Sequence, residues 1–461
     1  MPRRLASACV SALSFAGLLA LVGTSVFRAD ADVLDPTVAP TIAIGDGGAL
    51  WPTERGSYGR TGRVLSLPTT PKTRWTRAFA GRIEFAPIVA ADGGVIVLTS
   101  MSGTSGLEAA LFDLSPIDGA PRAQTHLPGD APAAAPILLA NGVRVVVAAR
   151  GDAIGIDPSG KIRFRTSLGG EFASVARVGV VPLPGGGFSV ARRSELLELD
   201  GSGAIVGRTR LEVTPAIAAR DNGDTVAVTS GGELYTWRAG RLPHLVGTFG
   251  VQGGGVSPLG VISAQVCPWG PVIDGDSSPA PGGRKERAIC VLGSESLVEQ
   301  IDLATGARRA LLGKPLLPFR TVAAVGAAGD LAIGSAGGTV TGVSVGGLDF
   351  GPIDLPGTIT APGKDGGIVI PTIGDIPPLV ANDGAVLFGA TDGVAIARPS
   401  GVVVRVARCG GAFASTVAGV SSAGPAAIVI ACVDGHVELI GDSGAPTPTT
   451  TPSASTDASS P

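Results

Sequence analysis

A pattern of short apolar runs and glycine-rich turns returns along most of this chain, and it limits the folds that the chain can adopt. Each return has an apolar alternation, a turn, a second apolar run, another turn, and a third run that ends near an Asp-x-x-x-Gly turn, as in residues 84–118. Three short strands of this kind, followed by a fourth and more variable one, are typical of a β-propeller blade. The repeat therefore predicts an all-β fold, a single β-propeller of four-stranded blades.

The ends of the third runs mark the repeat along the chain. Successive markers lie 44, 43, 37, 65, 41, 54 and 43 residues apart, an average of about 47, which suits one blade. Eight markers favour eight blades, and seven is the alternative if the sixth marker, which lacks the Asp, belongs to an insertion. The markers are Asp113, Asp157, Asp200, Trp237, Asp302, Val343, Ala397 and Ile440.

The composition agrees with a turn-rich fold and excludes one class of partner. Of the 461 residues, 70 are Gly, and Gly reaches positive φ in tight turns without steric cost. The net charge is −3, so the chain has no overall basic field that would attract nucleic acid.

The N-terminal region has the features of an export signal. Arg3 and Arg4 precede the uncharged stretch Ala6–Phe27, and residues 29–31 form the small-x-small sequence of a signal-peptidase site,. An uncleaved membrane anchor is the alternative, because the uncharged stretch is long enough to span a bilayer. Gly, Ser and Thr dilute its hydrophobicity, which favours cleavage. We therefore expect a protein exported to the periplasm, the outer membrane or the exterior.

The chain divides into four regions on this interpretation. Residues 1–31 are the expected signal peptide, residues 32–50 a flexible lead-in, and residues 51–441 the propeller. Residues 442–461 are rich in Pro, Thr and Ser and have no apolar side chain larger than Ala. Such a segment cannot bury enough apolar surface to offset the entropy of ordering, so we expect a disordered tail.

The segment before the first complete repeat resembles the start of the pyrroloquinoline-quinone-like propeller repeat family. In that family a Trp and an Arg-Thr-Gly precede a strand that ends in Trp; here these residues are Trp51, Arg60–Gly62 and Trp75. Later units such as QIDLATGARRAL are similar to the family's repeat unit. The resemblance implies the fold over Trp51–Ile440, but not an activity, because the repeat occurs in quinone enzymes and in periplasmic scaffolds alike.

The two ends of the repeat region predict how the ring closes. The last repeat supplies three strands and ends at Ile440, whereas Thr73–Phe79 precedes the first complete repeat. We expect Thr73–Phe79, which contains Trp75, to be the outer strand of the last blade and to pair with His436–Ile440. Such pairing removes open sheet edges.

Four cysteines of the mature region occur in matched positions. Cys267 and Cys290 are 23 residues apart, as are Cys409 and Cys432, and each pair has the same register within its repeat. An exported protein can form disulfides. We therefore expect Cys267–Cys290 and Cys409–Cys432 disulfides. A zinc site is not expected, because neither pair has the close spacing of zinc ligands.

An insertion in the longest interval is the most distinctive candidate for a binding loop. It spans Asp274–Arg287 and contains the densest charge cluster of the chain. The alternative is a solvated hairpin tip. The candidate interaction residues are Asp274, Asp276, Arg284, Lys285, Glu286 and Arg287.

The sequence offers no complete catalytic, cofactor or metal site. His126 and His244 are expected in loops between blades and His436 at the start of a third strand, none at metal-ligand spacing,. The G-x-S-x-G sequence at residues 342–346 lies in an expected strand without the helix that a nucleophile elbow needs,. The chain lacks the adjacent cysteines of some quinoproteins, and no calcium or quinone ligand set can be assembled.

These observations favour an exported, non-catalytic propeller without a cofactor. It would be a monomer that binds envelope or extracellular proteins, as does the propeller lipoprotein of the bacterial outer-membrane assembly machine within the resembled family. One alternative is an enzyme with a site in the axial channel, a quinoprotein-type dehydrogenase or a propeller lyase. A second is a surface sensor or adhesion module attached to the membrane by an uncleaved N-terminal segment.

Overall fold

A computed structural model shows a chain built from strands and turns, with no helix in the part that it describes. The chain divides into two compact units, Met1–Val38 and Ala39–Pro461, and every described residue lies in the second. The structure describes residues 59–103, 106–170, 178–192, 194–214, 216–250, 270–275, 285–292, 297–312, 323–326, 331–334, 340–343, 377–390, 393–400, 402–408, 414–419 and 426–442, together with Thr53, Ser57, Cys267 and Gly329.

The strands of the described residues form eight sheets, in which strands that follow one another along the chain are antiparallel neighbours. Short turns suffice for such connections. The first four sheets contain β3 (Ile88–Val89), β4 (Val95–Gly103), β5 (Gly106–Leu114) and β6 (Pro121–Leu127); β7 (Ile137–Leu138), β8 (Arg144–Val147), β9 (Asp152–Ile156) and β10 (Ile162–Ser167); β11 (Gly179–Pro182), β12 (Phe188–Arg192), β13 (Glu195–Leu199) and β14 (Ile205–Arg210); and β15 (Ala218–Ala219), β16 (Thr225–Val228), β17 (Glu233–Trp237) and β18 (His244–Thr248).

Two of the remaining four sheets include a strand from the start of the described chain. One of these strands, β1, is parallel to its neighbour β26, and the other, β2, is antiparallel to β32. The four sheets contain β19 (Val272–Asp274), β20 (Arg287–Leu292), β21 (Leu297–Asp302) and β22 (Arg308–Leu312); β23 (Ala324–Val325), β24 (Leu331–Gly334) and β25 (Val340–Val343); β1 (Arg63–Val64), β26 (Leu379–Ala381), β27 (Val386–Ala390), β28 (Gly393–Ala397) and β29 (Val403–Arg408); and β2 (Pro71–Ala78), β30 (Ala414–Gly419), β31 (Ala427–Cys432) and β32 (His436–Asp442).

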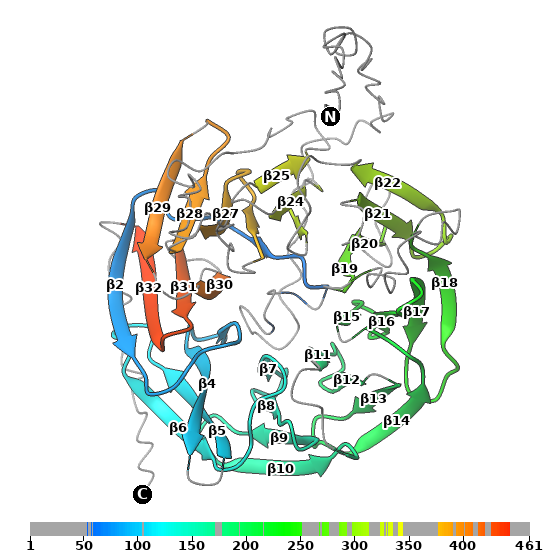
Figure 1. The fold of residues 1–461 in the computed structure, drawn as a ribbon, viewed down its shortest axis with the longest axis horizontal. Coiled ribbons are helices and arrows are strands. Elements are labelled where there is room, and N and C mark those ends of the chain that lie inside the picture. Colours follow the sequence, from blue (N-terminus) through cyan, green and yellow to red (C-terminus); the bar gives the residue numbers. More distant parts are fainter. Residues whose placement is uncertain are drawn as a thin grey trace, which may run out of the picture. The chain divides into compact units, whose positions relative to one another are not determined.

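The sheets of the second unit stand around one centre in chain order (Figure 1). In most sheets the first strand is innermost and the last is outermost, as β7 and β10 or β11 and β14 show; in the sheet of β2 the innermost strand is β30 and β2 is outermost. Burial follows this order: all four residues of β8 are buried, whereas exposed and half-buried residues alternate along β14. Continuous apolar runs therefore form the middle strands, and alternating runs form the outer ones.

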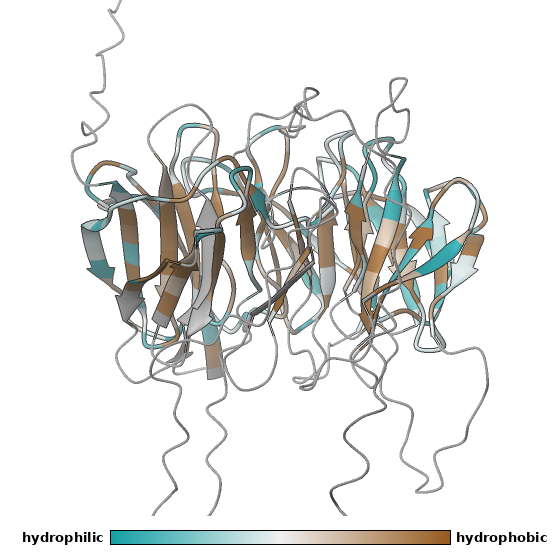
Figure 2. Cartoon of the chain, turned by 90° about the horizontal axis from the view of Figure 1, so that it is seen from above, coloured by the Kyte–Doolittle hydropathy of each residue, from teal (hydrophilic) through white to brown (hydrophobic). Residues whose placement is uncertain are grey.

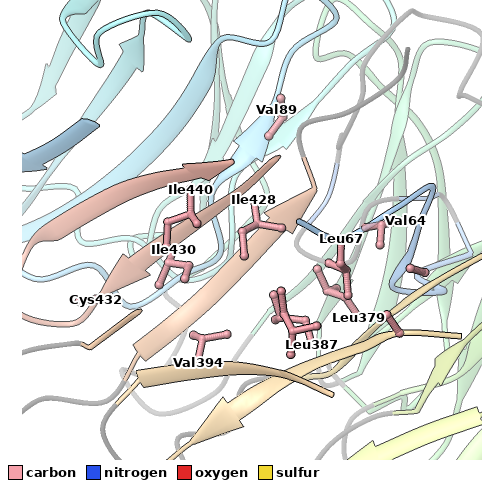
Figure 3. Close-up of a cluster of buried hydrophobic side chains, with 13 residues drawn as sticks. Val64, Leu67, Val89, Leu379, Leu387, Val394, Ile428, Ile430, Cys432 and Ile440 are labelled. Carbon is pink, nitrogen blue, oxygen red and sulfur yellow. The ribbon is translucent and has the colours of Figure 1, made fainter. Parts of the chain in front are cut away.

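The apolar core lies between neighbouring sheets. Figure 3 shows one cluster, in which Leu387 and Val394 face Ile428 and Ile430 of the next sheet. Seven further clusters have the same character among the described residues, and in the side view the apolar residues lie along the strands (Figure 2). The ring is thus held together by face-to-face packing of sheets, mostly through aliphatic side chains, with a few buried aromatic ones such as Phe188, Phe249 and Phe388,.

The Asp of the repeated marker has a clear structural role. The carboxylate of Asp157 accepts hydrogen bonds from the backbone N–H groups of Ser159 and Lys161, at 2.9 and 3.0 Å, and closes the turn between β9 and β10. Asp200 makes the same bonds before β14. The side-chain bond from Ser159, followed by the other donors, lowers the pKa of Asp157 to about 2. Asp302 has the same role, since it accepts from the N–H groups of Ala304 and Thr305, so at these three markers the Asp supplies an acceptor that the turn needs. Asp113 instead pairs with Arg122 and Arg144.

The strand expected at Thr73–Phe79 is β2, and it pairs with β32 from the other end of the described region. Trp75 lies opposite Leu439 and Ala78 opposite His436, and Thr73 lies opposite Ile440. The Trp75 side chain is buried and donates a hydrogen bond from Nε1 to the carbonyl O of Pro116, at 3.2 Å. It thus contacts the turn before β6 in the neighbouring sheet.

Candidate functional site

The centre of the ring is the first place to look for a site, because the innermost strands of all sheets converge there (Figure 1). A segment of the chain itself, residues 59–67, crosses this region; we call it the channel segment. Its carbonyl O atoms accept hydrogen bonds from the N–H groups of Ile273, Val325 and Val380, at 2.8, 2.8 and 3.0 Å. The donors belong to β19, β23 and β26, so one segment joins three sheets.

The channel segment approaches these strands closely. A Cβ atom at Gly59 would lie 2.4 Å from the carbonyl O of Ile273, so only Gly fits there,. Arg63 and Val64 form β1, which is parallel to β26. The segment therefore becomes part of the sheet that it reaches, and the inner-strand N–H groups of Ile273, Val325 and Val380, which could otherwise meet an axial ligand, bond to it.

Two arginine side chains attach the segment to the surrounding sheets. Arg60 is buried and directs its guanidinium to the carbonyl O of Ile217, at 3.5 Å. Arg63 donates to the carbonyl O atoms of Val325 and Gly326, at 3.2 and 2.8 Å. Buried guanidinium groups need such acceptors, because an unpaired buried donor costs free energy.

The carboxylate of Asp274 connects the channel segment to the 274–287 insertion. It forms ion pairs with Arg63 at 2.8 Å and with Arg287 at 3.1 Å, and its own side chain is 1% exposed. Arg287 also donates to Oε1 of Gln300 at 2.6 Å. Because Asp274 ends β19 and Arg287 begins β20, this carboxylate fixes both ends of the insertion.

Glu286 forms a second buried ion pair at the base of the insertion, where β19 ends and β20 begins. Its Oε2 accepts from Arg220, at 2.5 Å from Nη2 and 2.8 Å from Nε. Its Oε1 is buried and has no hydrogen-bond partner within the described part of the chain. Burial raises the pKa of Glu286 above its ordinary value of 4.5, and the neighbouring Arg220 guanidinium opposes this increase,.

The structure places four of the six candidate interaction residues of the insertion. Asp274, Glu286 and Arg287 form the largely buried base of the insertion. Their sheets bring them beside Arg63 and Arg220, and the five side chains form ion pairs there. Lys285 is exposed. Asp276 and Arg284 lie outside the described residues.

Comparisons with solved structures identify the arrangement. BamB from Moraxella catarrhalis is 16% identical and covers 81% of this chain and 100% of its own, with a TM-score of 0.54. Sqt1 of Saccharomyces cerevisiae is 10% identical and covers 81% and 99%, with a TM-score of 0.55. A structure described as the Dos1 propeller is 10% identical and covers 87% and 97%, with a TM-score of 0.50. The fold is a single β-propeller.

At the level of the fold, the expected resemblance to the pyrroloquinoline-quinone-like propeller family is confirmed. No protein-family model matches the chain, and no curated protein matches it. At such low identities the solved structures establish the fold alone.

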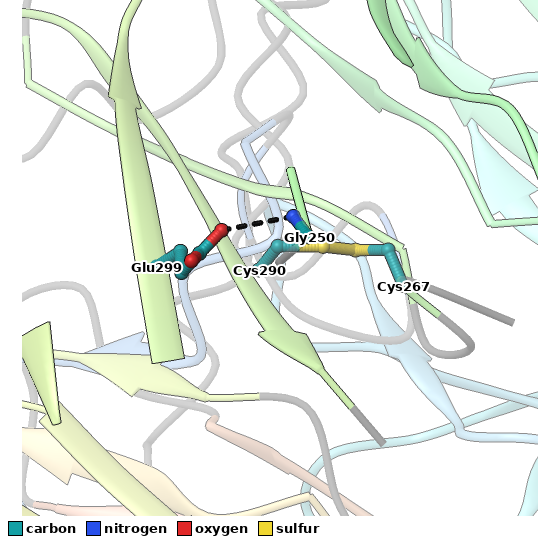
Figure 4. The surroundings of a disulfide bond; sticks show 4 residues. All are labelled: Gly250, Cys267, Cys290 and Glu299. Carbon is teal, nitrogen blue, oxygen red and sulfur yellow. Dashed lines mark hydrogen bonds between the residues drawn. A yellow bond between two sulfur atoms is a disulfide. The ribbon is translucent and has the colours of Figure 1, made fainter. Parts of the chain in front are cut away.

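The expected Cys267–Cys290 disulfide is confirmed. Cys267 and Cys290 are bonded, with a Cα–Cα distance of 5.8 Å, and both are fully buried. Nearby, Glu299 accepts a hydrogen bond from the N–H of Gly250 at 3.1 Å (Figure 4). Cys432 is also disulfide-bonded, whereas Cys409 lies outside the described residues.

The histidines occupy strands, and two of these positions differ from the expectation. His126 and His244 lie in the outer strands β6 and β18 rather than in loops between blades, because these strands are longer than their weak alternation indicated. His126 pairs with Glu108 at 2.9 Å. His436 opens β32, as expected.

The described residues offer neither a metal site nor a membrane-spanning helix. They contain no group of three or more His, Cys, Asp or Glu that could hold a metal ion. No helix among them is long and apolar enough to cross a membrane. Of the G-x-S-x-G sequence, Gly342 and Val343 lie in β25 and the rest lies outside the described residues.

The sequence missed the channel segment as a structural element. Arg60–Gly62 attracted notice as a family motif, but nothing in the sequence indicated that it crosses the ring. The available signal was its position, because Arg60–Gly62 precedes the first strand and belongs to no repeat. A segment that occurs once has no period, so its partners cannot be read from the repeat.

Proposed function

We propose that this protein is an exported, non-catalytic propeller that binds other proteins, with the 274–287 insertion as its docking element. In this proposal residues 51–441 form the propeller, each of the eight sheets is one blade, and β2 closes the ring by its pairing with β32. The partners are proteins of the cell envelope or the exterior, and the propeller itself is a monomer.

The observation that carries the proposal is the channel segment. Inner-strand N–H groups that could contact an axial ligand bond to Gly59, Thr61 and Gly62 of the same chain. At the sheets of β19, β23 and β26, a binding site is therefore favoured on the outer surface rather than at the axis of the ring. The insertion starts directly beside the channel segment, and two buried ion pairs hold its base in place. A loop whose base is rigid loses little conformational entropy when it binds a partner, which favours high affinity.

Export is proposed from the N-terminal signal and from the cysteines. The Cys267–Cys290 disulfide supports an oxidising compartment,. For Cys432 we propose Cys409 as the partner, because Cys267 and Cys290 are bonded to each other and Cys9 belongs to the expected signal peptide. Both disulfides would then lie at equivalent positions of two blades.

Docking at the insertion can be tested by shortening it. Residues 276–284 are replaced by a short Gly-Ser linker, which leaves Asp274, Glu286 and Arg287 in place. Wild type and variant are expressed in the native host and cross-linked in intact cells, and the cross-linked peptides are identified by mass spectrometry. We expect partner cross-links from blade surfaces around the insertion, and their loss in the variant at unchanged thermal stability.

The matched control shortens another turn of the same ring. Residues 184–187, between β11 and β12, are the equivalent connection of another blade and carry no charge. Partner cross-links that survive removal of the insertion, or that disappear equally in the control, would contradict docking at this element.

A further inference from the structure

The outermost strands of the propeller share a charge pattern. Seven of them lack Asp and Glu, and six of the seven carry twelve Lys or Arg between them, whereas β18 carries none; in the whole chain acidic residues outnumber basic ones, 38 to 35. The acidic residues lie instead on the third strands and in the turns, as Glu195 and Asp157 do. The seven strands are β2, β6, β10, β14, β18, β22 and β29.

Three of these strands form one continuous surface. The hydroxyl of Thr166 in β10 donates to the carbonyl O of Gly203, at 2.7 Å, directly before β14. Gly207 of β14 packs so closely on Ala239, before β18, that a Cβ at Gly207 would lie 2.5 Å from the Ala239 Cβ. We call residues 162–167, 205–210 and 241–248 the basic rim.

The basic rim also gathers exposed aliphatic side chains. Ile162, Val206, Leu242 and Leu245 are 48%, 51%, 89% and 49% exposed, and they are four of the six large apolar residues exposed among the described part of the chain. Exposed apolar side chains that gather on one surface beside polar groups mark interaction sites, and Arg is enriched at protein interfaces. The rim thus combines apolar contact area with positive charge.

The rim presents its positive charge outward although several of its arginines form ion pairs. Arg163 is 66% exposed and its partner Asp157 is 11% exposed; for Arg208 and Glu195, 3.8 Å apart, the values are 53% and 15%. The carboxylates are therefore covered and the guanidinium groups face solvent. Arg210 forms no ion pair within the described residues. An approaching partner meets cations rather than neutral pairs.

The central strand of the rim has an open edge. β14 pairs with β13 on one side and, within the described residues, with no strand on the other. Its exposed residues Val206, Arg208 and Arg210 alternate with half-buried ones. An added strand would place its side chains opposite these residues, so opposite charges and apolar pairs would face each other across the edge.

We propose that the basic rim binds an extended segment of a partner protein in which acidic and aliphatic residues alternate, and that this segment adds to the edge of β14. The covered carboxylates, the exposed arginines and the aliphatic alternation all select such a segment. This site is distinct from the insertion, and neither proposal depends on the other.

Binding can be measured with a defined probe. A fluorescein-labelled peptide of alternating Glu and Val is titrated with the whole mature protein, and fluorescence anisotropy reports the Kd. We expect saturable binding that weakens as salt is raised, because exposed charges are screened. A peptide of alternating Lys and Val should not bind. In Arg208→Glu/Arg210→Glu the Kd should rise about tenfold or more.

A matched variant and a neutral one make the result decisive. Lys72→Glu/Arg77→Glu makes the same change of charge on β2, another outer strand outside the rim, and should leave the Kd within about twofold. Arg208→Gln/Arg210→Gln should weaken peptide binding by an intermediate amount. It replaces the charge-reversal variant in the test if that variant does not fold. Equal losses in the β2 and β14 variants would overturn the proposal in favour of diffuse attraction. Binding to phosphatidylglycerol vesicles without binding to the peptide would overturn it in favour of a lipid surface.

Discussion

At the scale of single residues, buried carboxylates decide how this propeller is held together. Asp274 is nearly inaccessible and lies between two guanidinium groups, whereas Asp157 and Asp200 sit in turns and accept backbone N–H groups. The turn carboxylates could be predicted because the marker repeats. Asp274 and Glu286 could not, since their partners Arg63 and Arg220 are distant in sequence and nothing in the repeat relates them.

Removal of the Asp274 carboxylate should destabilise the protein strongly. In Asp274→Ala the guanidinium groups of Arg63 and Arg287 lose their shared partner while they stay largely covered, so we expect a loss of about 3 kcal/mol in the free energy of unfolding. Urea denaturation of the purified protein measures it. Arg82→Ala is the control, because Arg82 is 67% exposed and its ion pair is loose, and it should cost less than about 1 kcal/mol. Equal effects in both variants would contradict the role given to Asp274.

Glu286 should make stability depend on pH in a predictable direction. Because burial raises the pKa of Glu286 in the folded protein above 4.5, its ionised form is disfavoured by folding. Its contribution to stability is therefore fullest below pH 4.5, and it falls as the pH rises from 4.5 through the folded pKa,. Glu286→Gln removes this titration, so the stability of the variant relative to wild type should increase across that interval. Urea denaturation at several pH values tests it, and a constant difference would contradict the prediction.

At the scale of elements, the repeat predicted the strands well because each blade restates the same apolar pattern. Asp274–Arg287 was expected as an insertion, and β19 ends and β20 begins at these two residues. The expected strand Thr73–Phe79 appears as β2, Pro71–Ala78. The outer strands were least predictable: β6 and β18 carry little alternation, and the histidines within them were assigned to loops. Their positions follow from pairing with the third strand of the blade rather than from their own sequence.

Contact between β2 and the next blade should depend on Gly119. Gly119 has a φ of +70°, and a Cβ there would lie 2.7 Å from the Trp75 ring. Gly240 has a similar φ of +79° but no heavy atom within 4 Å of such a Cβ. Gly240→Ala should therefore lower the free energy of unfolding by about 1 kcal/mol, from backbone strain alone. Gly119→Ala should lower it clearly more, because Trp75 must also move. Equal thermal unfolding shifts in the two variants would show that Trp75 does not pack tightly there.

At the scale of the whole molecule, the channel segment gives the ring a contact that the repeat does not contain. The segment bonds to inner strands of separate blades, and Val64 and Leu67 join the core cluster of Figure 3. The ring is therefore held by packing between blades around its circumference and by this segment at its centre. The repeated pattern predicted the first of these, and only the structure shows the second.

Removal of the channel segment should expose specific backbone amides. A chain that begins at residue 69 lacks the carbonyl groups of Gly59, Thr61 and Gly62, so the amides of Ile273, Val325 and Val380 should exchange hydrogen faster,. A chain that begins at residue 51 is the control and should keep their protection. If the shorter chain does not fold, Arg63→Ala should raise exchange around Val325 and Gly326, whose carbonyls it releases. Unchanged exchange would contradict the position of the segment.

The most direct test of the central claim, an exported propeller that works by protein contacts with its own chain in the channel, is the mass of the native mature protein. It is measured denatured and again under native conditions. We expect a chain that begins at Asp32, lighter by two hydrogens for each of two disulfides, with the same mass under native conditions. A native mass raised by a quinone or a calcium ion would contradict the account and favour an enzyme with an axial site, and a chain that retains residues 1–31 would contradict cleavage and favour an anchored protein.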